Sequence, residues 1–231
     1  SGGTKALREG TSLVASLSRA RAWEEAVEAF QWLEEKGLTP NTVACNAAIG
    51  AWRVGGRWIQ ALGLLAFMRI RTLRPDLVSC TAAISACERA GQSEQAMQLL
   101  EEMKLAGLQV DNIAYNAALS ACEKGCQWEQ ALQLVEDMMH SAVEMDVITY
   151  NAVVSACEKC HQWEGAMAML RAMPLKRVSP DVITYSAAMS ACEKGQQWAL
   201  ALSLMEEMRK EQQRPNVITF NAAISACEKG G

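Results

Sequence analysis

The chain has 231 residues, of which 50% are hydrophobic and 21% are charged. This composition supplies enough apolar surface for a folded core and excludes a protein that is disordered throughout. With 22 Lys and Arg against 26 Asp and Glu, the formal net charge is -4. That balance excludes binding of nucleic acid by bulk positive charge, although it is compatible with a local basic stripe.

Cysteine usage and the chain ends bear on the compartment. Nine cysteines, an odd number, and the lack of a signal peptide favour a reducing compartment over a secreted disulfide-bonded scaffold. The uncharged apolar stretches are shorter than the roughly 20 residues that a membrane span needs, so no membrane contact is expected. The chain begins at Ser1 without Met and ends at Gly231, as expected of a piece of a longer polypeptide whose targeting segment would be absent here.

One unit of 35 residues repeats along the chain without insertion or deletion. The sequence Ser-Ala-Cys-Glu begins at five equally spaced positions: Ser85, Ser120, Ser155, Ser190 and Ser225. This register leaves residues 1–6 as an N-terminal flank and makes 7–231 a single array. Its units are 7–41, 42–76, 77–111, 112–146, 147–181, 182–216 and the partial unit 217–231. A fixed period of this length is typical of stacked repeats.

Each unit is predicted to form two helices. The second helix is followed by a glycine in two units, Gly37 and Gly107, and most units begin after a proline: Pro40, Pro75, Pro180 and Pro215. In the fifth unit Asp146 is a good N-cap for a helix over 147–159. A second helix is expected from Trp163 to Met173, with Pro174 as its stop. The apolar period of 3.6 excludes strands.

Short helix pairs bury their apolar faces only by stacking on neighbouring pairs, so the predicted fold is an all-α solenoid of helix-turn-helix repeats. With positions numbered 1 to 35 in each unit, positions 4, 7, 8 and 11 share one face of the first helix. In the fifth unit they are Tyr150, Val153, Val154 and Cys157. The second helix has a similar face, made of Trp163, Ala166, Met167, Leu170 and Met173. We expect both faces to form the core.

The opposite face of the first helix is restricted in another way. In the third to seventh units, positions 2, 5, 9 and 13 carry, in order, an apolar residue, an amide or hydroxyl, a hydroxyl and a cation. Position 5 is always Asn, Thr or Ser, and position 35 is always Asp or Asn. An alternative interpretation makes position 35 only an N-cap and position 5 only a polar residue of the first turn. It explains less well why positions 2, 5 and 13 are restricted together.

A linear row of such groups suits a linear polymer. Single-stranded RNA offers unpaired base edges that can be read one per repeat, and bases that pack on side chains. An apolar residue at position 2 would wedge between bases, and a cation at position 13 would contact phosphates. The cations fall in register at Arg89, Lys124, Lys159, Lys194 and Lys229. The second unit lacks this cation, having Val54, although Arg53 is adjacent.

The units resemble pentatricopeptide repeats over residues 7–231, with the 35-residue period and the pattern Pro-Asp-Val-Ile-Thr-Tyr-Asn-Ala. The resemblance implies a right-handed solenoid that binds single-stranded RNA, one nucleotide per repeat, N-terminus toward the 5′ end, in mitochondria or plastids. It implies base recognition through positions 5 and 35, here Thr11, Asn41, Asn46, Asp76, Thr81, Asp111, Asn116, Asp146, Asn151, Asp181, Ser186, Asn216 and Asn221. It implies base sandwiching by position 2, here Val43, Val78, Ile113, Ile148, Ile183 and Ile218. The first unit departs from the pattern at Arg8 and Gly10.

Hydrogen-bond chemistry gives a base for each pair. Uracil and guanine carry a ring N–H, which suits the acceptor-only Asp, whereas adenine and cytosine carry a ring acceptor, which suits Asn. A short Ser or Thr at position 5 leaves room for a purine, and Asn reaches a pyrimidine. The predicted site is therefore 5′-AUGUUA followed by a pyrimidine.

Other functions receive less support. Cys126, Cys160 and His161 would lie near one another in stacked repeats, but a fourth zinc ligand is not evident. No catalytic constellation occurs, so we expect no enzyme activity, no cofactor and no small-molecule substrate. Two alternatives remain open: a protein-binding helical scaffold, and the RNA-targeting arm of an enzyme whose catalytic domain lies outside this chain. Protein partners in RNA processing are compatible with either.

Overall fold

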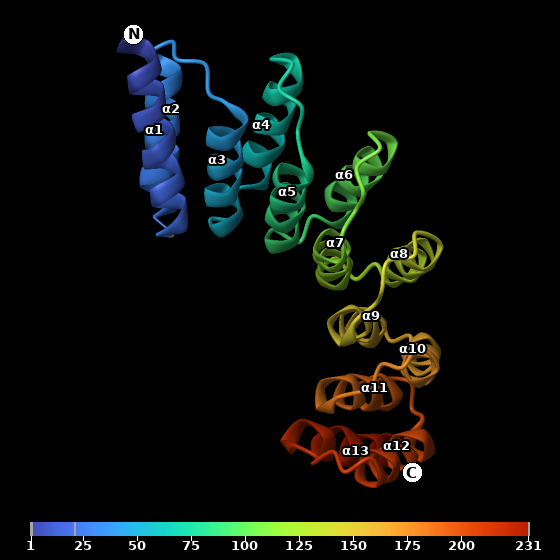
Figure 1. Ribbon diagram of the computed structural model, residues 1–231. Coiled ribbons are helices and arrows are strands. Elements are labelled where there is room, and N and C mark those ends of the chain that lie inside the picture. The colour runs from blue at the N-terminus through green and yellow to red at the C-terminus, as the bar shows by residue number, and fades with distance from the viewer. Residues whose placement is uncertain (1, 21, 231) are drawn as a thin grey trace. The chain divides into compact units, whose positions relative to one another are not determined.

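The computed structural model describes residues 2–20 and 22–230, and these residues form helices and connecting turns without a strand (Figure 1). The helices are α1 (Gly2–Arg19), α2 (Trp23–Glu35), α3 (Thr42–Val54), α4 (Trp58–Ile70), α5 (Leu77–Arg89), α6 (Ser93–Leu105), α7 (Asn112–Lys124), α8 (Trp128–His140), α9 (Val147–Lys159), α10 (Trp163–Leu175), α11 (Val182–Lys194), α12 (Trp198–Lys210) and α13 (Val217–Gly230). None of these described helices combines the length and apolar character that crossing a bilayer requires. The all-α prediction is confirmed.

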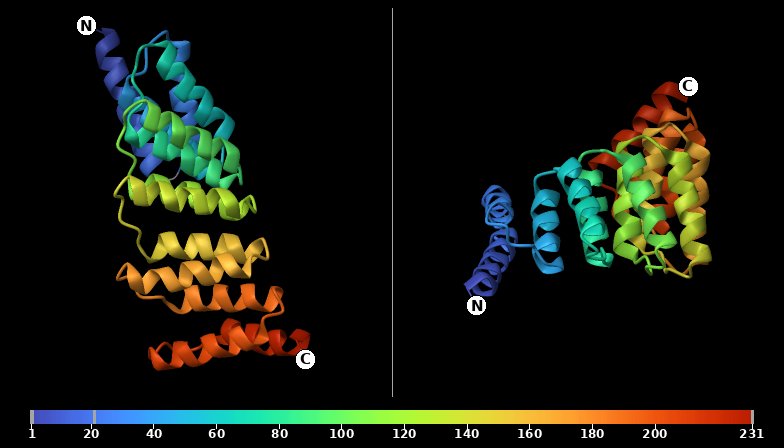
Figure 2. Two further views of the ribbon diagram at one scale, coloured as in Figure 1. Left: turned by 90° about the vertical axis from the view of Figure 1, so that its right-hand side faces the viewer. Right: turned by 90° about the horizontal axis from the view of Figure 1, so that it is seen from above.

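The chain divides into two compact units, one ending at Ala121 and the other beginning at Cys122. In the first unit α1, α3 and α5 pack on one another in order, and α2, α4 and α6 pack on the first helix of their own repeat. In the second unit α9, α11 and α13 form the corresponding row, with α10 and α12 packed beside it. Figure 2 shows the same order of helices within each unit from two further directions. Each unit is thus a helical repeat solenoid.

The N-terminus of each odd-numbered helix from α3 onward is capped by the side chain of the residue at position 35 of the preceding repeat. Asn41, Asp76, Asp111, Asp146, Asp181 and Asn216 each accept a hydrogen bond from the backbone N–H three residues later, at 2.8–2.9 Å. For α5, α9 and α11 the residue at position 3 returns a bond to the backbone of the cap, which completes a capping box. The predicted N-cap role is confirmed.

The turns after α3, α5, α7, α9 and α11 each contain one residue in the left-handed conformation. After α9 this residue is His161, with φ of 60°. The N–H of Gln162 bonds to the carbonyl of Cys157 at 2.8 Å, and that of His161 to Glu158 at 3.2 Å, as in a Schellman motif. Gly56 occupies the same position with φ of 64°. The Cys-x-x-Cys-His sequence therefore lies at a helix end and its turn.

The core follows the predicted faces, with two exceptions in the fifth unit. Tyr150, Val153, Val154 and Cys157 are buried, as are Ala166, Leu170 and Met173. Burial raises the pKa of the Cys157 thiol to about 11, with a further contribution from nearby Cys160, so this cysteine is a packing residue. Trp163 and Met167 are only half-buried. Trp163 lies at the edge of its repeat, where a Cβ atom on Gly195 would come within 2.3 Å of its Cδ1.

Two helix boundaries differ from prediction. Helix α10 continues through Pro174 to Leu175, because a proline in the last turn of a helix removes only one backbone N–H from its hydrogen bonds. Helix α1 begins at Gly2 and so includes residues 2–6, which the repeat register leaves as a flank. Gly10, where the fourth to seventh units have an aromatic residue, leaves room for Leu33, because a Cβ atom there would lie 2.4 Å from Leu33 Cδ2.

Candidate nucleic-acid interface

The residues at position 2 are the most uniform feature of the odd-numbered helices from α3 onward. All of them are large and apolar, and 60–66% of each is exposed: Val43, Val78, Ile113, Ile148, Ile183 and Ile218. Each stands in the first turn of its helix, two residues after the N-cap. Exposed apolar side chains at a fixed period are unusual for a solvated surface and are typical of a binding face.

Two of the predicted pairs are joined by direct hydrogen bonds. Asn46 Nδ2 on α3 lies 3.1 Å from both carboxylate oxygens of Asp76, the N-cap of α5. Asn151 Nδ2 on α9 lies 3.2 and 3.3 Å from those of Asp181, the N-cap of α11. Although burial raises the pKa of the Asp76 carboxyl, hydrogen bonds from the Ser79 N–H and the Asn46 amide outweigh it and leave the pKa below its usual value. The Asp76 carboxylate therefore caps α5 and binds the Asn46 amide at the same time.

A hollow of about 340 Å³ opens in the first unit between two position 2 side chains, Val78 and Ile113. Thr81 and Asp111, the predicted recognition pair of the third repeat, line it together with Asn46, Gly50, Arg53, Leu77, Ala82 and Ser85. The Thr81 hydroxyl is buried and has no hydrogen-bond partner among residues 2–20 and 22–230. An orphaned buried hydroxyl is costly unless a ligand supplies its partner.

The remaining recognition residues are placed less uniformly. Thr11 is 9% exposed, and its buried hydroxyl likewise lacks a partner in the described part of the chain. Ser186 is 7% exposed, and its hydroxyl donates to the carbonyl of Val182 at 2.6 Å. Asn221 is exposed. Asn116 and Asp146 fall in different compact units, so their pairing stays a prediction from the sequence.

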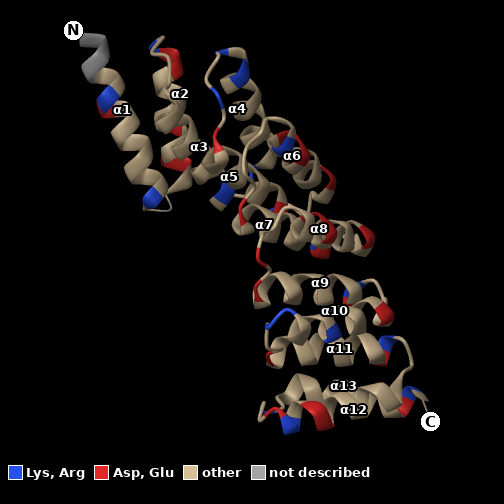
Figure 3. Cartoon of the chain, turned by 45° about the vertical axis from the view of Figure 1, so that its right-hand side comes forward, with Lys and Arg blue, Asp and Glu red and all other residues tan. Residues whose placement is uncertain are grey.

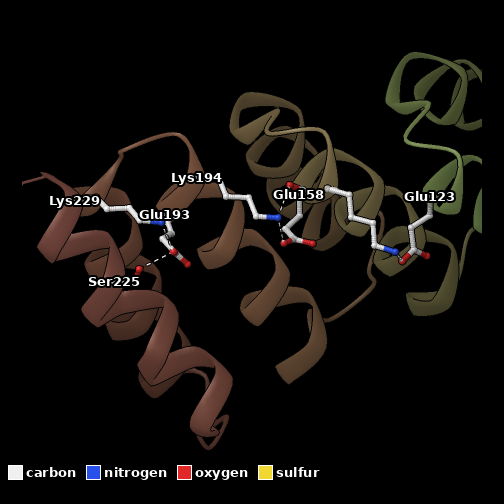
Figure 4. A network of polar contacts seen from close by, with 7 residues as sticks. Glu123, Glu158, Glu193, Lys194, Ser225 and Lys229 are labelled. Carbon is white, nitrogen blue, oxygen red and sulfur yellow. Dashed lines mark hydrogen bonds and ion pairs between the residues drawn. The ribbon is translucent and has the colours of Figure 1, made fainter.

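Three of the predicted phosphate contacts of the second unit are held in ion pairs between repeats. Lys159 Nζ lies 2.8 Å from Glu123, Lys194 Nζ 2.6 Å from Glu158, and Lys229 Nζ 2.8 Å from Glu193. Each glutamate is at position 12 of the preceding repeat. Figure 4 shows Lys194 pointing to Glu158 and Lys229 to Glu193. We call these glutamates and lysines the inter-repeat ladder.

Serines at position 9 also contact the glutamates at position 12. Ser225 Oγ donates to Glu193 at 2.7 Å, and Ser120 Oγ donates to Glu88 at 3.2 Å in the first unit. Burial raises the pKa of Glu193, but hydrogen bonds from Lys229 and Ser225 outweigh it and leave the pKa lowered. The hydrogen bond to Glu123 raises the pKa of Lys159. Sequence reasoning missed these glutamates as partners, and the signal was their constant offset of 36 residues from the lysines.

Two further cations stand at position 13. Arg89 of the third repeat, in the first unit, and Lys124 of the fourth repeat, in the second unit, are both exposed. Figure 3 shows acidic and basic residues interspersed in both units, in keeping with the small net charge. No group of three or more His, Cys, Asp and Glu side chains suited to a metal ion occurs among the described residues.

Comparison with known protein families shows which family has this repeat. The PPR repeat family matches residues 75–124, 110–159 and 145–194, and the pentatricopeptide repeat domain matches residues 190–229. The chain belongs to the pentatricopeptide repeat family.

Solved structures of family members are similar to the chain. The pentatricopeptide repeat protein PPR10 from maize is 30% identical over 95% of this chain, with a TM-score of 0.73. The chain spans only 31% of that maize chain. PPR10 in complex with an 18-nt psaJ RNA element covers 94% of this chain at 18% identity and a TM-score of 0.56, with 37% of its own length matched.

A second protein shows the same fold at lower identity. The PPR domain of Arabidopsis thaliana protein-only RNase P 1, in complex with tRNA, is 11% identical over 78% of this chain and 95% of its own, with a TM-score of 0.67. No curated protein is significantly similar to the chain in sequence.

Proposed function

We propose that the chain is a sequence-selective binder of single-stranded RNA, reading one nucleotide per repeat, and that it acts in organellar RNA metabolism: processing, stability, editing or translation. The observation that carries this proposal is the hollow of the third repeat. Its walls are the apolar side chains of Val78 and Ile113, and its polar lining is Thr81 and Asp111. Apolar walls with a few convergent polar groups suit a nucleobase, which stacks on its faces and forms hydrogen bonds at its edge.

The relatives support the same ligand. PPR10 from maize, which is 30% identical to this chain, has been crystallised with an RNA element, and the Arabidopsis PPR domain with tRNA. The unpaired Thr81 hydroxyl is a group that a purine edge satisfies, and the Asp111 carboxylate accepts the ring N–H of guanine. The third repeat accordingly selects guanine.

The same argument assigns the whole site as 5′-AUGUUA followed by a pyrimidine, from the 5′ base at Thr11 and Asn41 to the 3′ base at Asn221. We propose that the chain itself has no catalytic role and delivers its RNA to protein partners. An enzymatic domain elsewhere in a longer polypeptide is compatible with this role.

The test is binding of the purified chain to single-stranded AUGUUAU, against a scrambled RNA of identical composition, in moderate salt. We expect clear preference for the first. A second arm replaces Asn116 by Thr, which we expect to change the preferred fourth base from uracil to guanine, with a wrong base costing about 1–3 kcal/mol. Equal binding to both RNAs would remove the base assignments. Binding to neither, by a folded chain, would favour a protein-binding scaffold.

A further inference from the structure

The residue at position 3 of one repeat contacts the residue at position 5 of the repeat before it. Thr184, in the first turn of α11, places its Oγ1 atom 2.6 Å from Oδ1 of Asn151 on α9. Thr184 is fully buried and also belongs to the capping box of Asp181. Its hydroxyl accepts the Asp181 N–H at 3.1 Å, and Asp181 Oδ1 lies 2.9 Å away.

These three side chains fix which end of the Asn151 amide faces which neighbour. The Thr184 hydroxyl has one proton to donate. Its oxygen lies 2.6 Å from Asn151 Oδ1 and 2.9 Å from Asp181 Oδ1, so the proton goes to Asn151. The Asp181 carboxylate is acceptor-only, so it holds the NH₂ end of the amide. A flipped amide would set its oxygen against that carboxylate and leave the hydroxyl proton facing an NH₂ group. The amide therefore keeps one N–H for a ligand, while its oxygen is occupied.

The second repeat provides a natural contrast, because it has the same Asn and Asp but the repeat that follows it has Ser at position 3. Ser79 Oγ forms its hydrogen bonds with Asp76, donating to the carbonyl at 2.9 Å or to Oδ1 at 3.0 Å. Oδ1 of Asn46 is buried and has no hydrogen-bond partner in the described part of the chain. A β-branched threonine is restricted at χ1, whereas serine turns freely toward its own backbone. The contact to the position 5 amide is therefore present where the next repeat has threonine, at Asn151, and absent where it has serine, at Asn46.

We propose that Thr184 is a positioning residue for base recognition: its hydroxyl locks the Asn151 amide with an N–H outward. The fifth repeat then selects uracil, whose C4 carbonyl accepts that N–H, over cytosine, which carries an amine at C4. This inference rests on the proposed function. Position 3 of the following repeat then grades the selectivity of each Asn–Asp repeat, with threonine giving a stricter reading than serine.

A reciprocal exchange tests the proposal with little risk to folding, because Ser and Thr both complete the capping box in this chain. The variants are Thr184→Ser and Ser79→Thr. Affinities are measured for AUGUUAU and for the same RNA with cytosine at the second or at the fifth base. We expect Thr184→Ser to lower the uracil-to-cytosine ratio at the fifth base by roughly 3- to 10-fold, the value of one hydrogen bond, and not at the second. Ser79→Thr should raise the ratio at the second base only.

A second measurement needs no RNA. In the free protein the side-chain amide protons of Asn151 should exchange with solvent more slowly than those of Asn46, and Thr184→Val should remove the difference. Selective RNA binding with base ratios unmoved by the exchange would overturn the positioning role and leave the proposed function intact. Failure of the unmodified, folded chain to bind any of these RNAs would overturn the proposed function, whereas equal amide exchange rates at Asn151 and Asn46 would overturn the lock itself.

Discussion

Lys194 Nζ lies 2.6 Å from Oε1 of Glu158, one repeat earlier, and 3.2 Å from the Glu158 carbonyl. The lysine that the sequence assigns to a phosphate is therefore neutralised by a carboxylate of the protein. Under the proposed function, an RNA phosphate at this place would compete with Glu158 for the ammonium group. The inter-repeat ladder would then weaken nonspecific attraction to RNA and favour sites where the bases also fit.

Removing the competing carboxylate should strengthen RNA binding. We expect Glu158→Gln to raise the affinity for single-stranded RNA at low salt and to steepen the log–log salt dependence by about 0.7, the value of one additional neutralised phosphate. The measurement is a salt titration of binding. The matched control is Glu206→Gln, which changes the same charge at an exposed position of the second helix α12. A slope that both variants change equally would show that only net charge matters.

The ladder also predicts how stability depends on pH. The pKa of Glu193 is lowered in the folded state from its ordinary value of 4.5, so its stabilising contribution is complete above that value and is lost as the pH falls through the folded pKa. The pKa of Lys159 is raised from 10.5, so its contribution is complete below that value and is lost at higher pH. Urea unfolding from pH 3 to 7 should show a smaller loss of stability for Glu193→Gln than for the unmodified chain. Equal losses would contradict the assignment.

The ladder illustrates what sequence periodicity leaves out. The period alone predicted the exposed edge with Ile148 and the cap at Asp146, because both depend on local helix geometry. The contact from Lys194 to Glu158 depends on how far successive first helices are offset, which no local pattern encodes. The sequence also did not predict that Oδ1 of Asn151 has a hydrogen-bond partner while Oδ1 of Asn46 has none in the described part of the chain. That difference goes with one methyl group at position 3 of the next repeat.

The partial exposure of Trp163 could not be predicted from the sequence for a similar reason. A tryptophan in a helical apolar column predicts full burial, yet Trp163 is half-buried and lies against Gly195 of the next repeat. The column identified the face correctly, but the space available at its end depends on a residue 32 positions later.

That contact gives a prediction about stability. A Cβ atom on Gly195 would lie 2.3 Å from Trp163 Cδ1, so we expect Gly195→Ala to destabilise the chain by about 1–3 kcal/mol through overpacking. The control is Gly63→Ala in α4, where an added Cβ atom meets nothing within 4 Å. Alanine there should stabilise the chain by roughly 0.5–1 kcal/mol, because glycine is a poor helix former. Thermal unfolding measures both, and the same sign for the two variants would contradict the packing argument.

At His161, in contrast to Gly195, a substitution is expected to stabilise the chain. With φ of 60° it holds a left-handed conformation, which costs a non-glycine residue about 1–2 kcal/mol. His161→Gly removes that strain but adds freedom to the unfolded chain, so we expect a net stabilisation of up to about 1 kcal/mol in thermal unfolding. Gly107, with φ of 72° and open space around it, is the matched control: Gly107→Ala should destabilise by a similar amount. A loss of stability in His161→Gly would mean that the imidazole has a role beyond filling its place in the turn.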